Sequence, residues 1–370
     1  MLQKETPARS ASLPRPRPFS LDDKFSIEEG FILLSGIQAL ARLPIDQNRA
    51  DKRNGLNTAT LISGYRGSPL GGLDLTLQRY ESLIQQHNIR FLPAVNEELG
   101  ATAVFGSQIA NLLPGARYDG VLGMWYGKAP GVDRSGDVFK HANFAGIGRY
   151  GGVLALAGDD PISKSSTLPS HSEVALYDAI FPTLYPGNTQ EILDLGRLGF
   201  ELSRYSGLWT GFKIVTNVAD EFSMAEVHPN RVIVERPEFL FRNKPWQATQ
   251  STKLLTPDRL TLEREIHEGR LEAARRFAAT NGINTITVPT PNAWLGIVAA
   301  GKTYYDVLET LRQFGLDEHS LRDLGVRVLK LGMIFPVEPG IVREFAQGLE
   351  EIVVVEEKRS FVEVFLRDML

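Results

Sequence analysis

The chain has 370 residues, enough for two or three domains, and no uncharged apolar run approaches the ~18–20 residues that span a bilayer. Its 40 basic and 44 acidic side chains leave a net charge of −4, which gives no basic field for nucleic acid or an anionic membrane. The absence of cysteine excludes disulfides, thiol catalysis, cysteine-ligated zinc and any iron–sulfur cluster held by this chain. We therefore expect a soluble, cytoplasmic protein without a metal centre of its own.

Residues 1–20 hold four prolines among basic side chains and predict a disordered tail. A capping box of Ser26 and Glu29 then predicts a helix, with apolar residues at helical spacing from Phe31 to Leu40. Beyond it, short apolar segments alternate with helical ones. We expect strands at 58–63, 89–92, 121–126, 153–157 and 210–217, with helices between them. This alternation predicts an α/β fold with a doubly wound, mostly parallel sheet over residues 21–245.

Residues 246–282 are predicted to be a linker and a connector helix, which Thr256 caps and in which Pro257 takes the first position. The remaining residues, 283–370, predict a smaller α/β domain. Its strands are expected at 294–300, 326–331 and 352–355. One face of its first helix is expected to carry Val307, Leu308, Leu311 and Phe314.

Two segments match nucleotide-binding motifs. Gly146–Gly151 has the letters of a dinucleotide loop, but it follows a helix and precedes a strand, which is the reverse of the required order. We interpret it as a glycine-rich connection. Gly296–Thr303 matches the P-loop pattern, although residues 297–300 are typical of a strand interior rather than of a phosphate-binding loop. A P-loop nucleotide-binding protein remains an alternative hypothesis.

Chemically versatile side chains follow the predicted strands. The first strand is followed by Gly64–Gly72, and the second by Asn96-Glu97-Glu98. Later strands are followed by expected loops at 127–137 and 158–171. Because the carboxyl ends of parallel strands meet at one edge of a sheet, these segments predict a common ligand site.

Together with Lys140–Phe144, these four segments resemble the thiamine-diphosphate-dependent 2-oxoacid:ferredoxin oxidoreductases, most closely the long fused indolepyruvate ferredoxin oxidoreductases. The resemblance covers about residues 20–370. It implies a pyrimidine-binding domain followed by a transketolase-C-terminal-like domain, which we expect to be truncated at residue 370. It also implies two catalytic residues: Glu97, bonded to a ring nitrogen of the aminopyrimidine, and Ser68, close to the substrate.

The resemblance implies roles for further residues. Those expected to bind the cofactor beside Ser68 and Glu97 are Gly64, Tyr65, Gly67, Pro69 and Asn96. Lys128 and His171 are expected to meet the carboxylate or carbonyl group of the substrate. No residue of this chain is expected to bind a metal.

The resemblance also implies what the chain lacks. The cofactor's diphosphate and its Mg²⁺ need a module with a Gly-Asp-Gly turn, and this chain has no such sequence. We therefore expect the N-terminal part, or a split subunit, of an enzyme that oxidatively decarboxylates indolepyruvate or another arylpyruvate to an acyl-CoA. The implied partners are the 2-oxoacid, coenzyme A, ferredoxin, and complementary diphosphate-binding and iron–sulfur modules, in a homo- or hetero-oligomer. A non-catalytic remnant is a further alternative.

Overall fold

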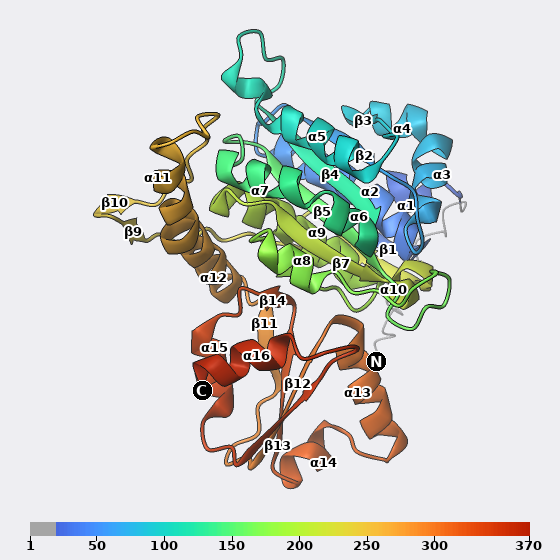
Figure 1. Cartoon of the computed structure of the whole chain (residues 1–370). Helices are drawn as coiled ribbons and strands as arrows, with labels where there is room; N and C mark the ends of the chain where they lie inside the picture. The colour runs from blue at the N-terminus through green and yellow to red at the C-terminus, as the bar shows by residue number, and fades with distance from the viewer. Residues whose placement is uncertain (1–19) are drawn as a thin grey trace, which may run out of the picture.

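The computed structural model describes residues 20–370, so the predicted tail lies, apart from Ser20, outside the described residues. Two sheets dominate the described part: a seven-stranded sheet in a larger unit and a four-stranded sheet in a smaller one (Figure 1). A helical segment runs from the side of the larger unit toward the smaller one. No helix within residues 20–370 combines the length and hydrophobicity needed to cross a membrane.

The seven-stranded sheet confirms the predicted doubly wound fold. Its strand order is β14-β6-β7-β5-β4-β2-β3, and all neighbours are parallel except β14 and β6. The strands are β2 (Thr58–Gly64), β3 (Ile89–Phe91), β4 (Gly120–Lys128), β5 (Gly152–Asp159), β6 (Thr183–Leu184), β7 (Thr210–Val215) and β14 (Met333–Phe335). The short strands β6 and β14 were not predicted.

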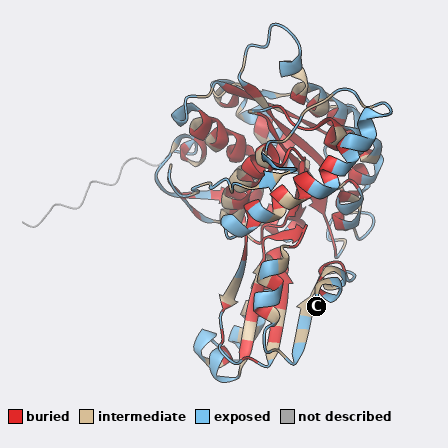
Figure 2. Cartoon of the chain, turned by 90° about the vertical axis from the view of Figure 1, so that its left-hand side faces the viewer, coloured by how far each residue is buried: buried red, intermediate tan, exposed pale blue. Residues whose placement is uncertain are grey.

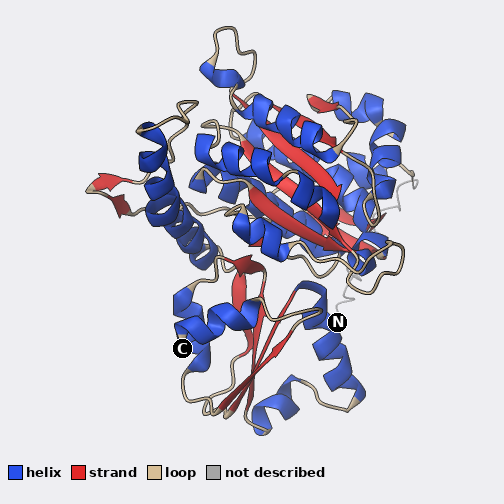
Figure 3. Cartoon of the chain, viewed as in Figure 1, coloured by secondary structure: helices blue, strands red, loops and turns tan. Residues whose placement is uncertain are grey.

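Helices cover both faces of this sheet (Figure 3). Alternate residues of β5 show why: Leu154 and Leu156 enter one core cluster, whereas Val153 and Ala155 enter another on the opposite face. Figure 2 shows in red the buried strands of the larger unit. The first face is covered by α2 (Gly36–Arg53) and α9 (Thr189–Ser206), and the second by α5 (Glu97–Gln108) and α7 (Gly136–Ala145). The shorter helices of the larger unit are α3 (Gly71–Arg79), α4 (Glu81–Gln85), η1 (Ala110–Leu112), α6 (Ala129–Arg134), α8 (Glu173–Asp178) and α10 (Thr216–Asp220).

The predicted first helix is wrong. The chain forms α1 (Asp23–Ser26) and then β1 (Gly30–Ser35), which pairs antiparallel with β8 (Phe222–Val227). Burial in β1 alternates with the period of a strand, and the pairing with distant β8 overrides the local helical spacing. The capping box is formed by Ser35 and Gln38 at the start of α2, not by Ser26 and Glu29.

The connector consists of a hairpin and a long helical segment. The elements are β9 (Leu240–Phe241), β10 (Lys244–Pro245), α11 (Asp258–Glu265), the π-helical turn η2 (Ile266–Arg270) and α12 (Leu271–Thr280). The predicted cap at Thr256 is wrong, because the helix begins at Asp258 and Pro257 occupies the cap position. A proline side chain has no acceptor atom, so no side chain caps this helix.

The smaller unit has the strand order β11-β13-β12-β15, with β11 antiparallel to β13 and the other pairs parallel. Its strands are β11 (Asn284–Val288), β12 (Leu295–Ala300), β13 (Val326–Leu331) and β15 (Glu351–Val355), and its helices are α13 (Gly301–Gln313), α14 (Glu318–Asp323), α15 (Pro339–Ala346) and α16 (Val362–Met369). Three of the four residues expected on one face of α13 pack into the core, but Phe314 lies past the helix end and is exposed.

The nucleotide-binding motifs take the forms expected of connecting segments. Gly146–Gly151 joins α7 to β5, which confirms the predicted helix-to-strand connection. The P-loop alternative is not supported, because residues 296–300 lie in β12 and α13 begins at Gly301. The segment therefore has no loop whose free amide groups face a phosphate.

Buried Arg270 fastens the connector to the larger unit. Its Nε donates to Glu265 Oε1 at 2.9 Å, and its terminal nitrogens donate to the carbonyl oxygens of Asn143 at 2.7 Å and Thr249 at 3.1 Å. Arg270 is fully buried, so water cannot replace these bonds.

We expect Arg270→Met to lower the free energy of unfolding by about 3–5 kcal/mol, because it removes the cation paired with buried Glu265 and the donor to the Asn143 and Thr249 carbonyls. Urea denaturation measures this loss. Arg276→Met is the matched control, because Arg276 makes a half-exposed pair with Glu272 and its loss should cost under about 1 kcal/mol. Equal losses in the two variants would contradict the role given to Arg270.

Candidate active site at the carboxyl edge of the large sheet

The strand order creates a topological switch point between β2 and β4. From β2 the chain passes to β3 on one side of it, and then to β4 on its other side. The connections that leave the carboxyl ends of β2 and β4 therefore diverge, which is where open α/β sheets bind ligands. The predicted site residues lie on the segments around this point.

Glu97 is the first residue of α5, and local bonds hold its backbone. The Asn96 side chain caps the helix by accepting from the Leu99 amide at 2.8 Å, and Trp125 Nε1 donates to the Glu97 carbonyl at 2.9 Å. Glu97 is 8% exposed, and within residues 20–370 no hydrogen bond or ion pair engages its carboxylate. A largely buried carboxylate without a protein partner is suited to hydrogen-bonding a ligand.

Close backbone packing sets the depth of Glu97. A Cβ atom at Gly100 would lie 2.7 Å from the Gly64 Cα, so only glycine lets α5 lie this close to the end of β2. A Cβ atom at Gly131 would lie 2.4 Å from the Glu97 Cγ. The Glu97 side chain thus occupies space that the glycine in α6 leaves free.

Lys128 and the Gly64–Gly72 segment lie together. Lys128 is the last residue of β4, and its Cδ is 3.1 Å from the position of a Cβ at Gly67. The Tyr65 amide donates to the Tyr126 carbonyl at 3.0 Å, which holds the start of the segment against β4. The loop predicted at 127–137 is wrong, because α6 begins at Ala129 and α7 follows.

The loop after β5 is organised by Asp160. Its carboxylate accepts from the amides of Lys164 and Ser165, both at 2.8 Å, and of Ser166 at 2.7 Å. Burial raises the pKa of Asp160, but these amide donors outweigh it and lower the pKa to about 2. The Ser165 hydroxyl also meets the Ser68 hydroxyl, so the structure brings the predicted loops together.

His171 lies at the end of the same loop. Its Nε2 is enclosed and has no hydrogen-bond partner among the described residues. The next residue, Ser172, donates to Asp159 Oδ2 through its amide at 2.9 Å and its hydroxyl at 3.0 Å. The Nε2 of His171 therefore makes no hydrogen bond to Lys128, and the common role of these two residues in binding substrate stays a prediction.

A buried charge cluster lies beneath this loop, and the sequence interpretation missed it. Lys213 Nζ lies 3.2 Å from Glu173 Oε2, 3.3 Å from Glu357 Oε2 and 3.9 Å from Asp159 Oδ2. Lys213 falls within a strand that was correctly predicted, but a lone lysine in an apolar strand does not indicate its partners. Glu357 comes from the smaller unit, after β15, and only the folded chain brings it near.

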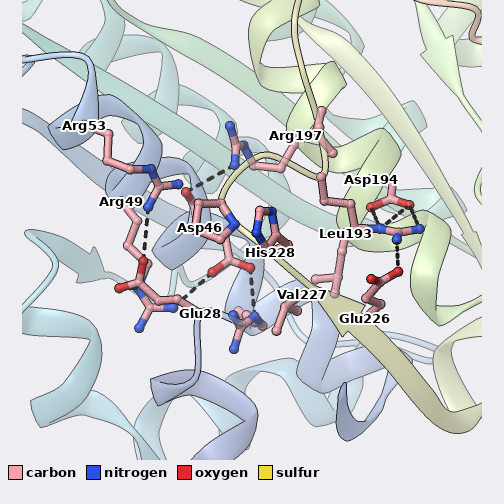
Figure 4. Close-up of a pocket in the computed structure, with 14 residues that line it drawn as sticks. Glu28, Asp46, Arg49, Arg53, Leu193, Asp194, Arg197, Glu226, Val227 and His228 are labelled. Atoms are coloured by element: carbon pink, nitrogen blue, oxygen red, sulfur yellow. Dashed lines mark hydrogen bonds and ion pairs between the residues drawn. The ribbon is translucent and has the colours of Figure 1, made fainter. Parts of the chain in front are cut away.

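A small cavity lies elsewhere, between α2, α9 and residues 226–232 (Figure 4). Its volume is about 40 Å³, and it contains none of the predicted site residues. Its charged groups pair with one another, as in Arg42 with Asp46 at 2.7 Å and Arg231 with Asp194 at 2.9 Å. We interpret it as a structural ion-pair network. Within residues 20–370 no group of three or more metal-ligating side chains converges.

The fold is shared with a solved 2-oxoacid oxidoreductase. The structure of 2-oxoglutarate:ferredoxin oxidoreductase from Magnetococcus marinus, with 2-oxoglutarate, coenzyme A and succinyl-CoA bound, matches with a TM-score of 0.65 at 12% identity. The match covers 92% of this chain and 60% of that chain. The match shows that the two proteins share this fold.

Sequence comparisons are more specific. A family model described as an indolepyruvate oxidoreductase domain matches residues 285–370. Indolepyruvate oxidoreductase subunit IorA from Methanothermobacter marburgensis is 27% identical over 93% of this chain and 49% of its own length. The Pyrococcus horikoshii subunit of the same name is 28% identical over 67% of this chain and 36% of its own length. The chain is thus similar to indolepyruvate oxidoreductase subunits over most of its own length, and it spans about half or less of the length of these curated relatives.

We expect Gly131→Ala to lower the free energy of unfolding by about 1–3 kcal/mol, because the new methyl group displaces the Glu97 side chain. Gly136→Ala is the matched control, since a Cβ at this helical glycine meets no atom within 4 Å. Thermal or urea unfolding measures both variants. A neutral Gly131→Ala variant would show that Glu97 does not depend on this contact.

A second prediction concerns Asp159 and the pH dependence of stability. Burial raises the pKa of Asp159 to about 7; Lys213 opposes the shift and Glu173 adds to it. The pKa of Asp159 in the folded protein lies above the ordinary value of about 3.9. The contribution of protonated Asp159 to the free energy of unfolding is therefore complete at low pH and is lost as the pH rises toward 7. Asp159→Asn removes this dependence.

The test measures melting temperatures of the wild type and Asp159→Asn at about pH 5 and about pH 8. The wild type should lose stability relative to the variant as the pH rises. A constant difference between the two proteins would contradict the raised pKa.

Proposed function

We propose that the chain is the pyrimidine-binding part of an indolepyruvate- or arylpyruvate-type 2-oxoacid oxidoreductase. The observation that carries this proposal is the buried, unpartnered Glu97 carboxylate at the switch point of the large sheet. The relatives supply the substrate class, because they are named indolepyruvate oxidoreductase subunits. Modules that bind the diphosphate and hold the iron–sulfur clusters complete the enzyme.

Glu97 is suited to holding an aminopyrimidine. In the water-poor space beside Gly131, its carboxylate has no competing donor, so it accepts from, or shares a proton with, a ring nitrogen. Thiamine diphosphate, when bound, supplies the electron sink on which a 2-oxoacid loses carbon dioxide. The part played by this chain is to hold the pyrimidine ring and the proton at its nitrogen.

The neighbouring segments shape the rest of the proposed site. Gly64, Tyr65, Gly67, Pro69 and Asn96 hold the edge on which the cofactor rests. Ser68 presents its hydroxyl beside the loop after β5, where it meets Ser165. The cationic group of Lys128 and the free Nε2 of His171 suit a substrate carboxylate or carbonyl.

The proposed assembly includes components outside this chain. The diphosphate and its Mg²⁺ are assigned to the complementary module, and electron transfer to iron–sulfur modules and ferredoxin. Coenzyme A is the proposed acyl acceptor, and the proposed location is the cytoplasm. The half-length match to the relatives supports this division.

We expect Glu97→Gln in the completed enzyme to lower kcat by about 10²- to 10⁴-fold, because an amide cannot share a proton with the ring nitrogen. Glu98→Gln is the matched control, since Glu98 is the exposed next residue in the first turn of α5. Steady-state oxidation of indolepyruvate or phenylpyruvate measures both. Full activity of Glu97→Gln would overturn the assignment.

A binding measurement separates this function from a non-catalytic remnant. Calorimetry follows titration of thiamine diphosphate and Mg²⁺ into the chain combined with its diphosphate-binding module. Saturable binding that weakens in Glu97→Gln supports the proposal. Absence of binding in the completed assembly supports the remnant.

A further inference from the structure

The Lys213 cluster joins three separate parts of the chain. Lys213 lies in β7, Asp159 ends β5, Glu173 begins α8, and Glu357 follows β15 in the smaller unit. The side chains of Lys213 and Glu173 are 5% and 7% exposed, and that of Asp159 is inaccessible. One ammonium group is therefore the shared cation of three acidic side chains in a place that water barely reaches, and its loss would leave them facing one another without a positive charge.

Tyr185 holds Glu357, the residue that the smaller unit contributes to the Lys213 cluster. Its hydroxyl donates to Glu357 Oε2 at 2.8 Å, and its ring lies 4.6 Å from Lys213 Nζ. The Tyr185 amide also donates to the Gly332 carbonyl at 2.9 Å, next to the point where β14 joins the large sheet. Glu357 is thus held by two donors of the larger unit.

The cluster continues into the loop that meets Ser68. Asp159 accepts both donors of Ser172, and Glu173 is the next residue, so the carboxyl end of the loop is tied to Lys213 through two carboxylates. The other end is tied by Asp160. The position of His171, immediately before Ser172, depends on the first of these ties.

We propose that Lys213 is a positioning residue: it holds residues 160–172, and with them His171, over the substrate site, and Glu357 couples this loop to the smaller unit. This inference rests on the proposed function only where it concerns the substrate. Lys213 acts through Asp159 and Glu173 and touches none of the proposed site residues itself.

Hydrogen exchange of the full-length chain tests the loop directly. In Lys213→Met the amide of Ser172 should exchange at least about tenfold faster, because Asp159 and Glu173, which anchor this end of the loop, lose their common cation. Lys330→Met is the matched control. Lys330 also joins the two units, through Glu191 and Tyr305, but it does not contact the loop.

If Lys213→Met does not fold, Glu173→Gln provides a second test of the same proposal. This change removes one of the two ties between Lys213 and the loop without leaving a buried cation unpaired, and exchange at Ser172 should rise about threefold. Unchanged exchange in the loop, or an equal increase in Lys330→Met, would overturn the proposal.

Kinetics of the completed enzyme test the link to substrate. Lys213→Met should raise KM for the 2-oxoacid about tenfold and change kcat by less than about threefold, since the loop binds substrate and does not take part in chemistry. A lower kcat with an unchanged KM would indicate a purely structural role and overturn the claim. If the wild-type assembly shows no oxidoreductase activity, the proposed function fails, while hydrogen exchange still decides whether Lys213 holds the loop.

Discussion

The close approach of α5 to β2 is the constraint on which the candidate site depends. Gly100 lies against Gly64 with no room for a Cβ atom, so the start of α5 reaches the end of the sheet. Gly131 leaves the matching space on the other side, and Glu97 fills it. The carboxylate is therefore buried by backbone contacts rather than by polar partners, and it stays available for a ligand.

The two sheets are parts of one packed structure. β14, from the C-terminal part of the chain, pairs with β6 at the edge of the large sheet, and Glu357 enters the Lys213 cluster nearby. The smaller unit thus contributes backbone pairing and charge to the base of the loop that meets Ser68. Its influence on the site is through position, because none of its residues lies among those predicted to bind the cofactor.

Sequence patterns predicted the parts of the fold that local chemistry determines. The buried strands β2, β4 and β5 are continuous apolar runs, and Asn96 before α5 is a standard cap. Patterns failed where distant pairing decides. Residues 31–34 have helical spacing yet pair with β8, and the two- and three-residue strands β6 and β14 exist only because they pair with neighbours.

The candidate site, like the fold, could be predicted from the sequence only in part. The four segments around the switch point could be predicted because parallel strands bring their carboxyl ends to one edge. Glu97 is predicted through family resemblance, and its packing against Gly131 could not be inferred from spacing. Lys213 and Glu357 are 144 residues apart in the chain, and no local signal pairs them.

The proposed role of Glu97 is tested most directly by an experimental structure of this chain assembled with its diphosphate-binding module, thiamine diphosphate and Mg²⁺. The distance to measure is that from the Glu97 carboxylate to the nearest ring nitrogen of the aminopyrimidine. The account predicts a hydrogen bond of about 2.6–3.0 Å, with the ring at the switch point between β2 and β4. A cofactor bound elsewhere, or a Glu97 carboxylate turned away from the ring, would contradict it.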